Sequence, residues 1–353
     1  MSKWRRTTLE ELAHFQRGFD ISKAEQQPGN VPVVSSSGVT SYHSVAKVKG
    51  PGVTIGRKGT LGTVFYVPQD YWPHSTSLWV TDFNGNEPKF VYYFLKTLGL
   101  EQYDVGASNP TLNRNHIHGL QIAIPDVKTQ RRIADILSAY DDLIENNRRR
   151  IAILEDTARL VYRKWFGGGE QGRTATLGEI ADVVMGQSPE SKTYNDNGEG
   201  LPFHQGVTGF GFRYPQNEMW CTMGTRFAEE GDILFSVRAP VGRINVAGER
   251  IVIGRGLSAM RAKNGCQSWL LYALKHHFSK EDMIGVGCIF ASTTKKELLS
   301  EDLPFPPDAE ISAFEQVAEP IDAQIKALSK QSAALAAARD MLLPRLMKGE
   351  VVS

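Results

Sequence analysis

The sequence predicts an α+β protein in which two pseudo-symmetric globular units are joined by two long antiparallel helices that form a coiled coil. Three observations lead to this fold class. A segment of about 180 residues occurs twice in the 353-residue chain, each copy is rich in short strands separated by turns, and each copy ends in a long helix with heptad-like spacing. Hydrophobic residues make up 41% of the chain and charged residues 22%, which excludes a disordered or collagen-like protein.

The two copies align along most of their length. The offset between them grows from 168 residues near the start to 181 in the helices, so the second copy has a longer early loop, at 188–200. The aligned segments are TLEELAHFQRG (8–18) with TLGEIADVVMG (176–186), YFLK (93–96) with YALK (272–275), and Asp141 with Asp322. We therefore divide the chain into a globular unit at 1–127, a helix at 128–169, a second unit at 170–307 and a second helix at 308–353.

Each copy predicts the same order of elements. A short amphipathic helix comes first, then strands, an aromatic helix at 88–98 or 267–278, and a last strand that ends in proline. The expected strands are VPVVSS, GVTIGR, GTVFYV and LQIAIP in the first copy, and DILFSV, GRINVA and RIVIG in the second.

Helical periodicity begins after Pro125 and again after Pro306. The first helix would be about 55 Å long at 1.5 Å per residue, and the glycines at 167–169 end it. Pro320 and Pro344 predict a start or kink and a frayed end in the second helix. We expect the two apolar seams to pack against each other. The first seam is Ile136, Tyr140, Leu143, Asn147, Ile151, Leu154, Ala158, Val161 and Trp165; the second is Phe314, Val317, Ile321, Ile325, Leu328, Leu335, Leu342 and Leu346.

Several segments closely resemble the specificity subunit of type I restriction-modification systems, and the resemblance runs through nearly the whole chain. The segments are GFDISK, KVKGPGVTIGRKGTLGTVFYV, FVYYFLKTL, GASNPTLNRNHIHGLQIAIP, TQRRIADILSAYDDLIENNRRRIAILEDTARLVYRKWF and the terminal LLPRLMKGEV. The resemblance implies that each globular unit is a target recognition domain that binds one half of a bipartite, asymmetric DNA site. It also implies that the helices set the spacing of the half-sites and dock two methyltransferase subunits, which restriction subunits then join.

The sequence gives no sign of catalysis by this chain itself. NPTL at 109–112 lacks the second proline and the aromatic residue of an adenine methyltransferase motif, and GRKGTLGT at 56–63 has the wrong spacing for a phosphate-binding loop. Cys221, Cys266 and Cys288 are scattered, and His116 and His118, which lie two residues apart, are more typical of a polar face than of a metal site. By resemblance, S-adenosylmethionine, ATP and Mg²⁺ belong to the partner subunits.

The same features predict where the protein works. No run of about 18 apolar residues could span a membrane, and the scattered cysteines favour a reducing compartment. We expect a cytoplasmic, nucleoid-associated prokaryotic protein. Because its net charge is only +1, we expect DNA to be bound by local groups of basic side chains and not by the overall charge of the protein. An enzyme acting alone and a scaffold that does not read DNA remain the alternatives.

We predict DNA contacts in polar and basic loops. GRKGTLG (56–62) combines glycines with two cations, and NPTLNRNHIHG (109–119) is dense in side chains that bind bases and phosphates. A tight hairpin and a turn that satisfies its own backbone are the structural alternatives. The candidates are Ser36, Ser37, His43, Arg57, Lys58, Thr60, Asn109, Thr111, Asn113 and Arg114 in the first copy, and Thr208, Arg213, Arg238, Arg243, Thr293, Thr294 and Lys295 in the second.

Residues on the helices are candidates for a second kind of contact. The arginines at 148–150 form either a solvated face or a contact with DNA or a methyltransferase subunit. The candidates for contact with the other helix or with a partner are Tyr140, Asn147, Ile151, Leu154, Trp165, Ile321, Leu328, Leu335 and Leu342.

Overall fold

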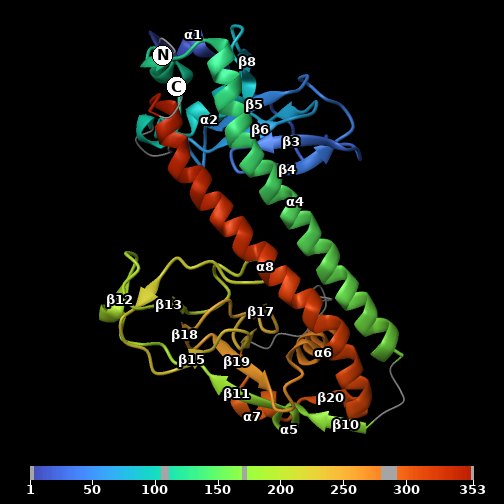
Figure 1. The fold of residues 1–353 in the computed structure, drawn as a ribbon. Helices are drawn as coiled ribbons and strands as arrows, with labels where there is room; N and C mark the ends of the chain where they lie inside the picture. The colour runs from blue at the N-terminus through green and yellow to red at the C-terminus, as the bar shows by residue number, and fades with distance from the viewer. Residues whose placement is uncertain (1–3, 105–110, 169–172, 280–291, 351–353) are drawn as a thin grey trace. The chain divides into compact units, whose positions relative to one another are not determined.

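The computed structural model of the protein describes residues 4–104, 111–168, 173–279 and 292–350. These residues form two compact units (Figure 1). Unit 1 contains Met1–Asn146 and Gln331–Ser353, and unit 2 contains Asn147–Lys330. Each of the two long helices therefore contributes one part to each unit. Within the described residues, no helix combines the length and apolar character needed to cross a membrane.

Unit 1 is built from three small sheets. The two-stranded sheet pairs β1 (Arg5–Thr8) with β9 (Gln121–Ile124). The four-stranded sheet has the order β2 (His14–Arg17), β8 (Ser77–Asp82), β5 (Gly52–Gly56) and β6 (Val64–Val67). The three-stranded sheet has the order β4 (Gly38–His43), β3 (Val31–Ser35) and β7 (Trp72–Pro73). Its short helices are α1 (Leu9–Leu12), α2 (Pro88–Leu95), the 3-10 helix η1 (Leu100–Tyr103) and α3 (Arg114–Ile117).

Unit 2 repeats this plan in the same order along the chain. A two-stranded sheet pairs β10 (Arg173–Thr176) with β20 (Asp302–Phe305), and a four-stranded sheet has the order β11 (Ala181–Met185), β19 (Leu257–Ala262), β16 (Ile233–Ser236) and β17 (Ile244–Val246). The third sheet has the order β12 (Tyr194–Asn195), β14 (Trp220–Cys221), β13 (Leu201–His204), β18 (Ile251–Ile253) and β15 (Phe227–Ala228). Its short helices are α5 (Leu177–Ile180), the 3-10 helix η2 (Ser191–Thr193), α6 (Gln267–Ser279) and α7 (Lys295–Leu299). The predicted duplication is confirmed.

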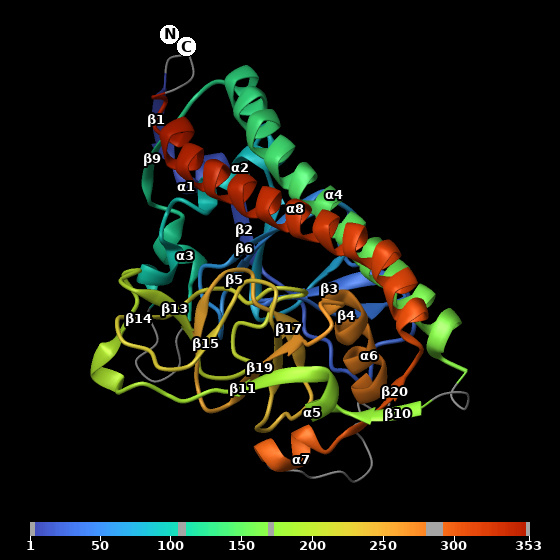
Figure 2. The same cartoon turned by 60° about the horizontal axis from the view of Figure 1, so that its bottom comes forward.

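The long helices are α4 (Val127–Phe166) and α8 (Asp308–Met347). The first part of α4 and the last part of α8 lie in unit 1, whereas unit 2 holds the remaining part of each, so the two run antiparallel (Figures 1 and 2). In unit 1, Ile133 and Leu137 of α4 and Leu346 of α8 join one apolar core with Phe90 of α2. In unit 2, Tyr162, Phe314, Phe235 and Trp269 belong to the corresponding core.

The expected short first helix is confirmed as α1, whereas the helix start expected at Pro320 is wrong. The segment at 8–18 forms a single helical turn, α1, and continues as strand β2, because Ala13 adopts an extended backbone right after the turn. Helix α8 begins at Asp308 and runs through Pro320 and Pro344 without a break. Both prolines lie on the exposed side of the helix, where water can bind the carbonyls that they leave free.

The predicted seams are partly wrong as well. Leu143, Trp165 and Val317 are exposed, whereas Tyr162 and Ala318, which lie outside the predicted seams, are buried. The buried stripe is rotated because each helix packs on the globular part of its unit as well as on the other helix. Among the predicted contacts, Trp165 still lies 6.0 Å from the ring of Phe314. Asn147 and Leu328 are buried, and the half-buried ones are Tyr140, Ile151, Leu154, Ile321, Leu335 and Leu342.

Candidate nucleic-acid interface

The two predicted DNA-binding loops are closed by equivalent backbone hydrogen bonds. One joins β5 to β6 in unit 1, and the other joins β16 to β17 in unit 2. The amide of Gly62 donates to the carbonyl of Gly56 at 3.0 Å, and the amide of Gly242 donates to the carbonyl of Ser236 at 3.0 Å. Gly62 and Gly242 both have a positive φ, at 72° and 88°, which glycine adopts without strain. The two loops are therefore equivalent where they close, whereas their tips differ, because Gly59 has a φ of 78° and the Ala239–Pro240 peptide bond is cis.

A second predicted segment lies directly beside each loop. Lys58 pairs with Thr111 in an antiparallel bridge, and Arg238 pairs with Ser292 in the same way. Two further backbone hydrogen bonds, each 2.9 Å long, hold these segments together: Leu112 N to Arg57 O, and Thr293 N to Val237 O. We call the two assemblies the paired loops: residues 56–62 with 111–114 in unit 1, and residues 236–242 with 292–295 in unit 2.

In unit 1 the turn between β3 and β4 lies next to the paired loops, and Thr76 is hydrogen-bonded to both. The amides of Arg57 and Lys58 donate to the carbonyl of Thr76 at 2.9 and 3.1 Å, and the amide of Ser36 donates to the Thr76 hydroxyl at 3.3 Å. A polar groove of about 250 Å³ lies beside this turn. Its polar lining includes Lys23, Gln26, Ser41, His74 and Thr76, which the sequence did not single out. The polar run HSTS at 74–77 is the signal that could have pointed to it.

Most of the candidate cations are accessible to a ligand. Lys58, Arg114, Arg238, Arg243 and Lys295 are all exposed. The exposed candidates without charge are Ser37, Thr60 and Thr208, whereas Ser36 is buried and Thr111 and Thr293 are half-buried. An exposed cation can approach a phosphate without first being released from a protein partner that encloses it, so these side chains suit the predicted role.

Arg57 is less exposed than the other loop cations. Its guanidinium donates to the carbonyl of Ser75 at 3.5 Å, and the side chain is half-buried. Burial lowers the pKa of Arg57, the charge of Arg17 lowers it further, and the nearby Asp20 raises it. Arginine remains charged at neutral pH despite such shifts, so Arg57 can still bind an anion.

Asn113 and Thr294 occupy equivalent positions and cap short helices. Asn113 Oδ1 accepts from the amide of Asn115 at 3.0 Å, at the start of α3. Thr294 Oγ1 accepts from the amide of Glu297 at 3.3 Å, and the Glu297 carboxylate accepts from the amide of Thr294, which completes a capping box at the start of α7. Both residues thus fit the structural alternative, a turn in which side chains bond the backbone, and their contact with DNA stays a prediction.

Two predicted contacts are wrong, and one cannot be placed. Arg213 is only 4% exposed and is enclosed by acidic side chains, so it cannot reach DNA. His43 is 7% exposed; its Nδ1 accepts from the amide of Gln27 at 3.0 Å, and its ring packs edge-on against Trp72. Both lie in polar-aromatic segments whose composition resembles that of a surface loop. Asn109, like Cys288, lies outside the described residues.

Glu10, His14 and His118 form the one cluster within the described residues whose side chains could surround a metal ion. Glu10 Oε1 lies 3.6 Å from Nε2 of His14 and 3.4 Å from Nδ1 of His118. The amide of Phe15 donates to Nε2 of His118 at 3.3 Å, which assigns the proton of a neutral ring to Nδ1, the atom that faces Glu10. A metal-bound histidine donates from its second nitrogen, so this pattern fits a hydrogen bond to Glu10 better than a metal site.

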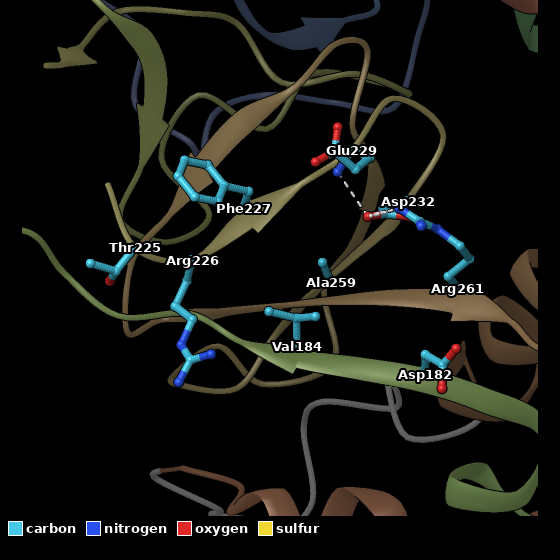
Figure 3. Close-up of a pocket in the computed structure, with 9 residues that line it drawn as sticks. All are labelled: Asp182, Val184, Thr225, Arg226, Phe227, Glu229, Asp232, Ala259 and Arg261. Carbon is cyan, nitrogen blue, oxygen red and sulfur yellow. Dashed lines mark hydrogen bonds and ion pairs between the residues drawn. The ribbon is translucent and has the colours of Figure 1, made fainter. Parts of the chain in front are cut away.

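The pocket in Figure 3 lies on the β11–β19 face of unit 2 and has a volume of about 320 Å³. Asp182 and Arg261 lie at one end and Thr225 and Arg226 at the other. Its lining includes three carboxylates and two guanidiniums, and Arg261 is already paired with Asp232 at 2.8 Å. This charge balance disfavours DNA phosphates, so the paired loops remain the candidate interface.

Comparison with known proteins gives consistent matches. Residues 1–156 and 173–332 match the type I restriction modification DNA specificity domain. A Methanocaldococcus jannaschii chain that carries the name of the MjaX type I restriction enzyme specificity subunit is 30% identical over 293 residues, which cover 76% of this chain and 69% of that one. The MjaIX specificity subunit of the same organism is 22% identical over 307 residues, which cover 76% and 70%. The solved S subunit of a type I restriction-modification system from M. genitalium has the same fold, with a TM-score of 0.66, 18% identity, and coverage of 98% of this chain and 96% of that one.

Proposed function

This chain belongs to the type I restriction-modification DNA specificity family, and from that premise we propose that it selects the DNA sequence on which such a system acts. The observation that carries the proposal is the repetition of the paired loops. The Lys58–Thr111 bridge of unit 1 and the Arg238–Ser292 bridge of unit 2 present cations on the same backbone framework. Two equivalent frameworks suit a bipartite site, with one half bound by each unit.

The differences between the two frameworks support an asymmetric site. Unit 1 presents Arg57 and Lys58 where unit 2 has Val237 and Arg238. Unit 1 also has the groove that Ser36 borders beside the β3–β4 turn. Since base readout depends on which side chains reach the base edges, different side chains on one framework favour different bases.

We further propose that the long helices dock two methyltransferase subunits, which restriction subunits join. Exposed apolar side chains on these helices support a docking role, because they would be covered in a complex. They are Leu143, Ile153, Leu160 and Trp165 on α4, and Val317 and Met341 on α8. In this proposal the chain is non-catalytic and works in the cytoplasm at the nucleoid, and the partners bind S-adenosylmethionine, ATP and Mg²⁺.

Methylome sequencing tests the proposed function. A host that expresses this chain with its cognate methyltransferase is compared with the same host lacking this chain. We expect a bipartite, asymmetric adenine motif that disappears with the chain. Unchanged methylation would exclude the specificity role and leave a scaffold that joins partners without reading DNA.

A further inference from the structure

A buried ionic cluster in unit 2 connects a loop of the globular part to both long helices. The Arg213 guanidinium contacts Glu155 of α4 at 2.7 Å and Asp322 of α8 at 2.5 Å. Lys275 of α6 also pairs with Glu155, and the Tyr272 hydroxyl donates to Asp322 at 3.0 Å. Burial lowers the pKa of Arg213, but the charges of Asp322 and Glu155 outweigh it and raise the pKa above its ordinary value. Arg213 is therefore a fixed cation between the two helices.

Unit 1 holds a related cluster in which the cation comes from a helix. The Tyr93 hydroxyl donates to Asp141 of α4 at 2.5 Å, as Tyr272 does to Asp322. The cation that pairs with Asp141 is Arg339, which lies on α8 itself. With the offset of 181 residues between the helices, the position equivalent to Arg339 on α4 is Ala158. In unit 2 the loop residue Arg213 therefore supplies the charge that a helix residue supplies in unit 1.

Arg213 lies in a tight hairpin that is bonded to an edge strand. Within this hairpin, residues 209–216, the amide of Gln216 donates to the carbonyl of Gly209 at 2.8 Å. The amide of Val246 in β17 donates to the carbonyl of Arg213 at 3.0 Å, and the side chain of Asn245 donates to the carbonyl of Gly211 at 3.0 Å. Strand β17 follows directly after residues 236–242, the loop that carries Arg238. A continuous set of contacts thus leads from the helices through Arg213 to the paired loops of unit 2.

We propose that Arg213 is a positioning residue that fixes the paired loops of unit 2 relative to the helices, so that DNA selection by this unit depends on it. This inference rests on the proposed function and names how one of its two halves is held in place. A buried ion pair is weak evidence for stability, because removing charges from water offsets most of their attraction. What the cluster does supply is one defined geometry, since both carboxylates must be met by the same planar guanidinium.

The test needs a variant that loses the anchor and still folds. Arg213→Met alone would leave two buried carboxylates facing Lys275. The double variant Arg213→Met, Glu155→Gln removes one charge of each sign, so Lys275 and Asp322 remain balanced. Its matched control is Arg250→Met, Glu229→Gln, which removes an exposed ion pair of 3.3 Å from the same unit.

The assay uses the full chain in complex with its methyltransferase partner. Competition binding compares duplexes that carry the intact site, found by methylome sequencing, with duplexes substituted in one half. We expect the double variant to lose about tenfold of its discrimination in one half-site and to keep its discrimination in the other. The control variant should discriminate in both halves as the wild type does. Arg213→Lys, which keeps the charge but meets only one carboxylate well, should show a smaller loss in the same half.

Each other outcome has a defined meaning. A folded double variant that discriminates like the wild type, or that loses both halves equally, overturns the role of Arg213 and leaves the proposed function intact. A wild-type complex without sequence preference refutes the proposed function itself. If circular dichroism shows that neither Arg213 variant folds, Arg213 is a residue required for folding and the positioning role is rejected.

Discussion

Removing exposed cations from the paired loops of unit 1 should weaken the salt dependence of DNA binding by an amount that can be stated in advance. Lys58 and Arg114 are exposed and lie on adjacent segments, so we propose the double variant Lys58→Ala, Arg114→Ala. Each phosphate contact contributes about −0.9 to the slope of log K against log salt concentration. Loss of two contacts should reduce the slope by about 1.8. Between 50 and 200 mM salt, this corresponds to about a 12-fold smaller fall in affinity.

Fluorescence anisotropy of a labelled duplex, titrated with the complex at four or five salt concentrations, measures this slope. Arg5→Ala is the matched control, because Arg5 is a cation of the same unit whose charge is already opposed by Glu11 at 3.7 Å. An unchanged slope in the double variant would refute the assignment of these cations to phosphate. An equal change in the control would show that the effect comes from net charge alone.

Two further predictions concern unit 2. Phe314 is fully buried, and its ring packs against those of Tyr162, at a centroid distance of 5.6 Å, and Trp165. Phe314→Ala should therefore lower the free energy of unfolding by about 3–5 kcal/mol, whereas Val317→Ala on the same helix should lower it by about 0.5 kcal/mol or less. Urea denaturation measures both values, and similar values would contradict the assigned core. Burial lowers the pKa of His204 below 6.5, so on acidification His204 is protonated in the unfolded state before it is protonated in the folded state, and unit 2 should lose stability as the pH falls below about 6.5. His204→Gln should make the free energy of unfolding less dependent on pH in this range. An unchanged pH profile would refute the assignment.

Patterns that depend on neighbouring residues predicted the fold well. The strand expected at GVTIGR is β5, the aromatic helix expected at 267–278 is α6, and the helix expected from 128 to 165 is α4. In each, residues two to four positions apart share a face, so the signal lies within a few residues of the chain. The pairing of Lys58 with Thr111 is different, because more than 50 residues separate them and no local period links them.

Arg213 shows why composition misleads at a single position. The segment QGVTGFGFR has the glycines, aromatics and cation of a DNA-binding loop, and its neighbour Phe212 is indeed 67% exposed. The partners of Arg213 are Glu155 and Asp322, on helices that lie before and after the globular part in the sequence. Only the folded chain places these two carboxylates next to each other, so the burial of Arg213 could not be read from its own segment.

The division of α4 and α8 between the units has a consequence for synthesis on the ribosome. Unit 2 is one continuous stretch, 147–330, whereas unit 1 takes its core from both sides of that stretch. The packing of Ile133 and Leu137 is complete only when Leu346 is present. At about 5–20 residues per second, synthesis of the chain between Leu137 and Leu346 takes on the order of ten to forty seconds. The end of α8 therefore completes a core that was begun before unit 2 was synthesised, and the nascent protein exposes an unfinished apolar surface until that end is available.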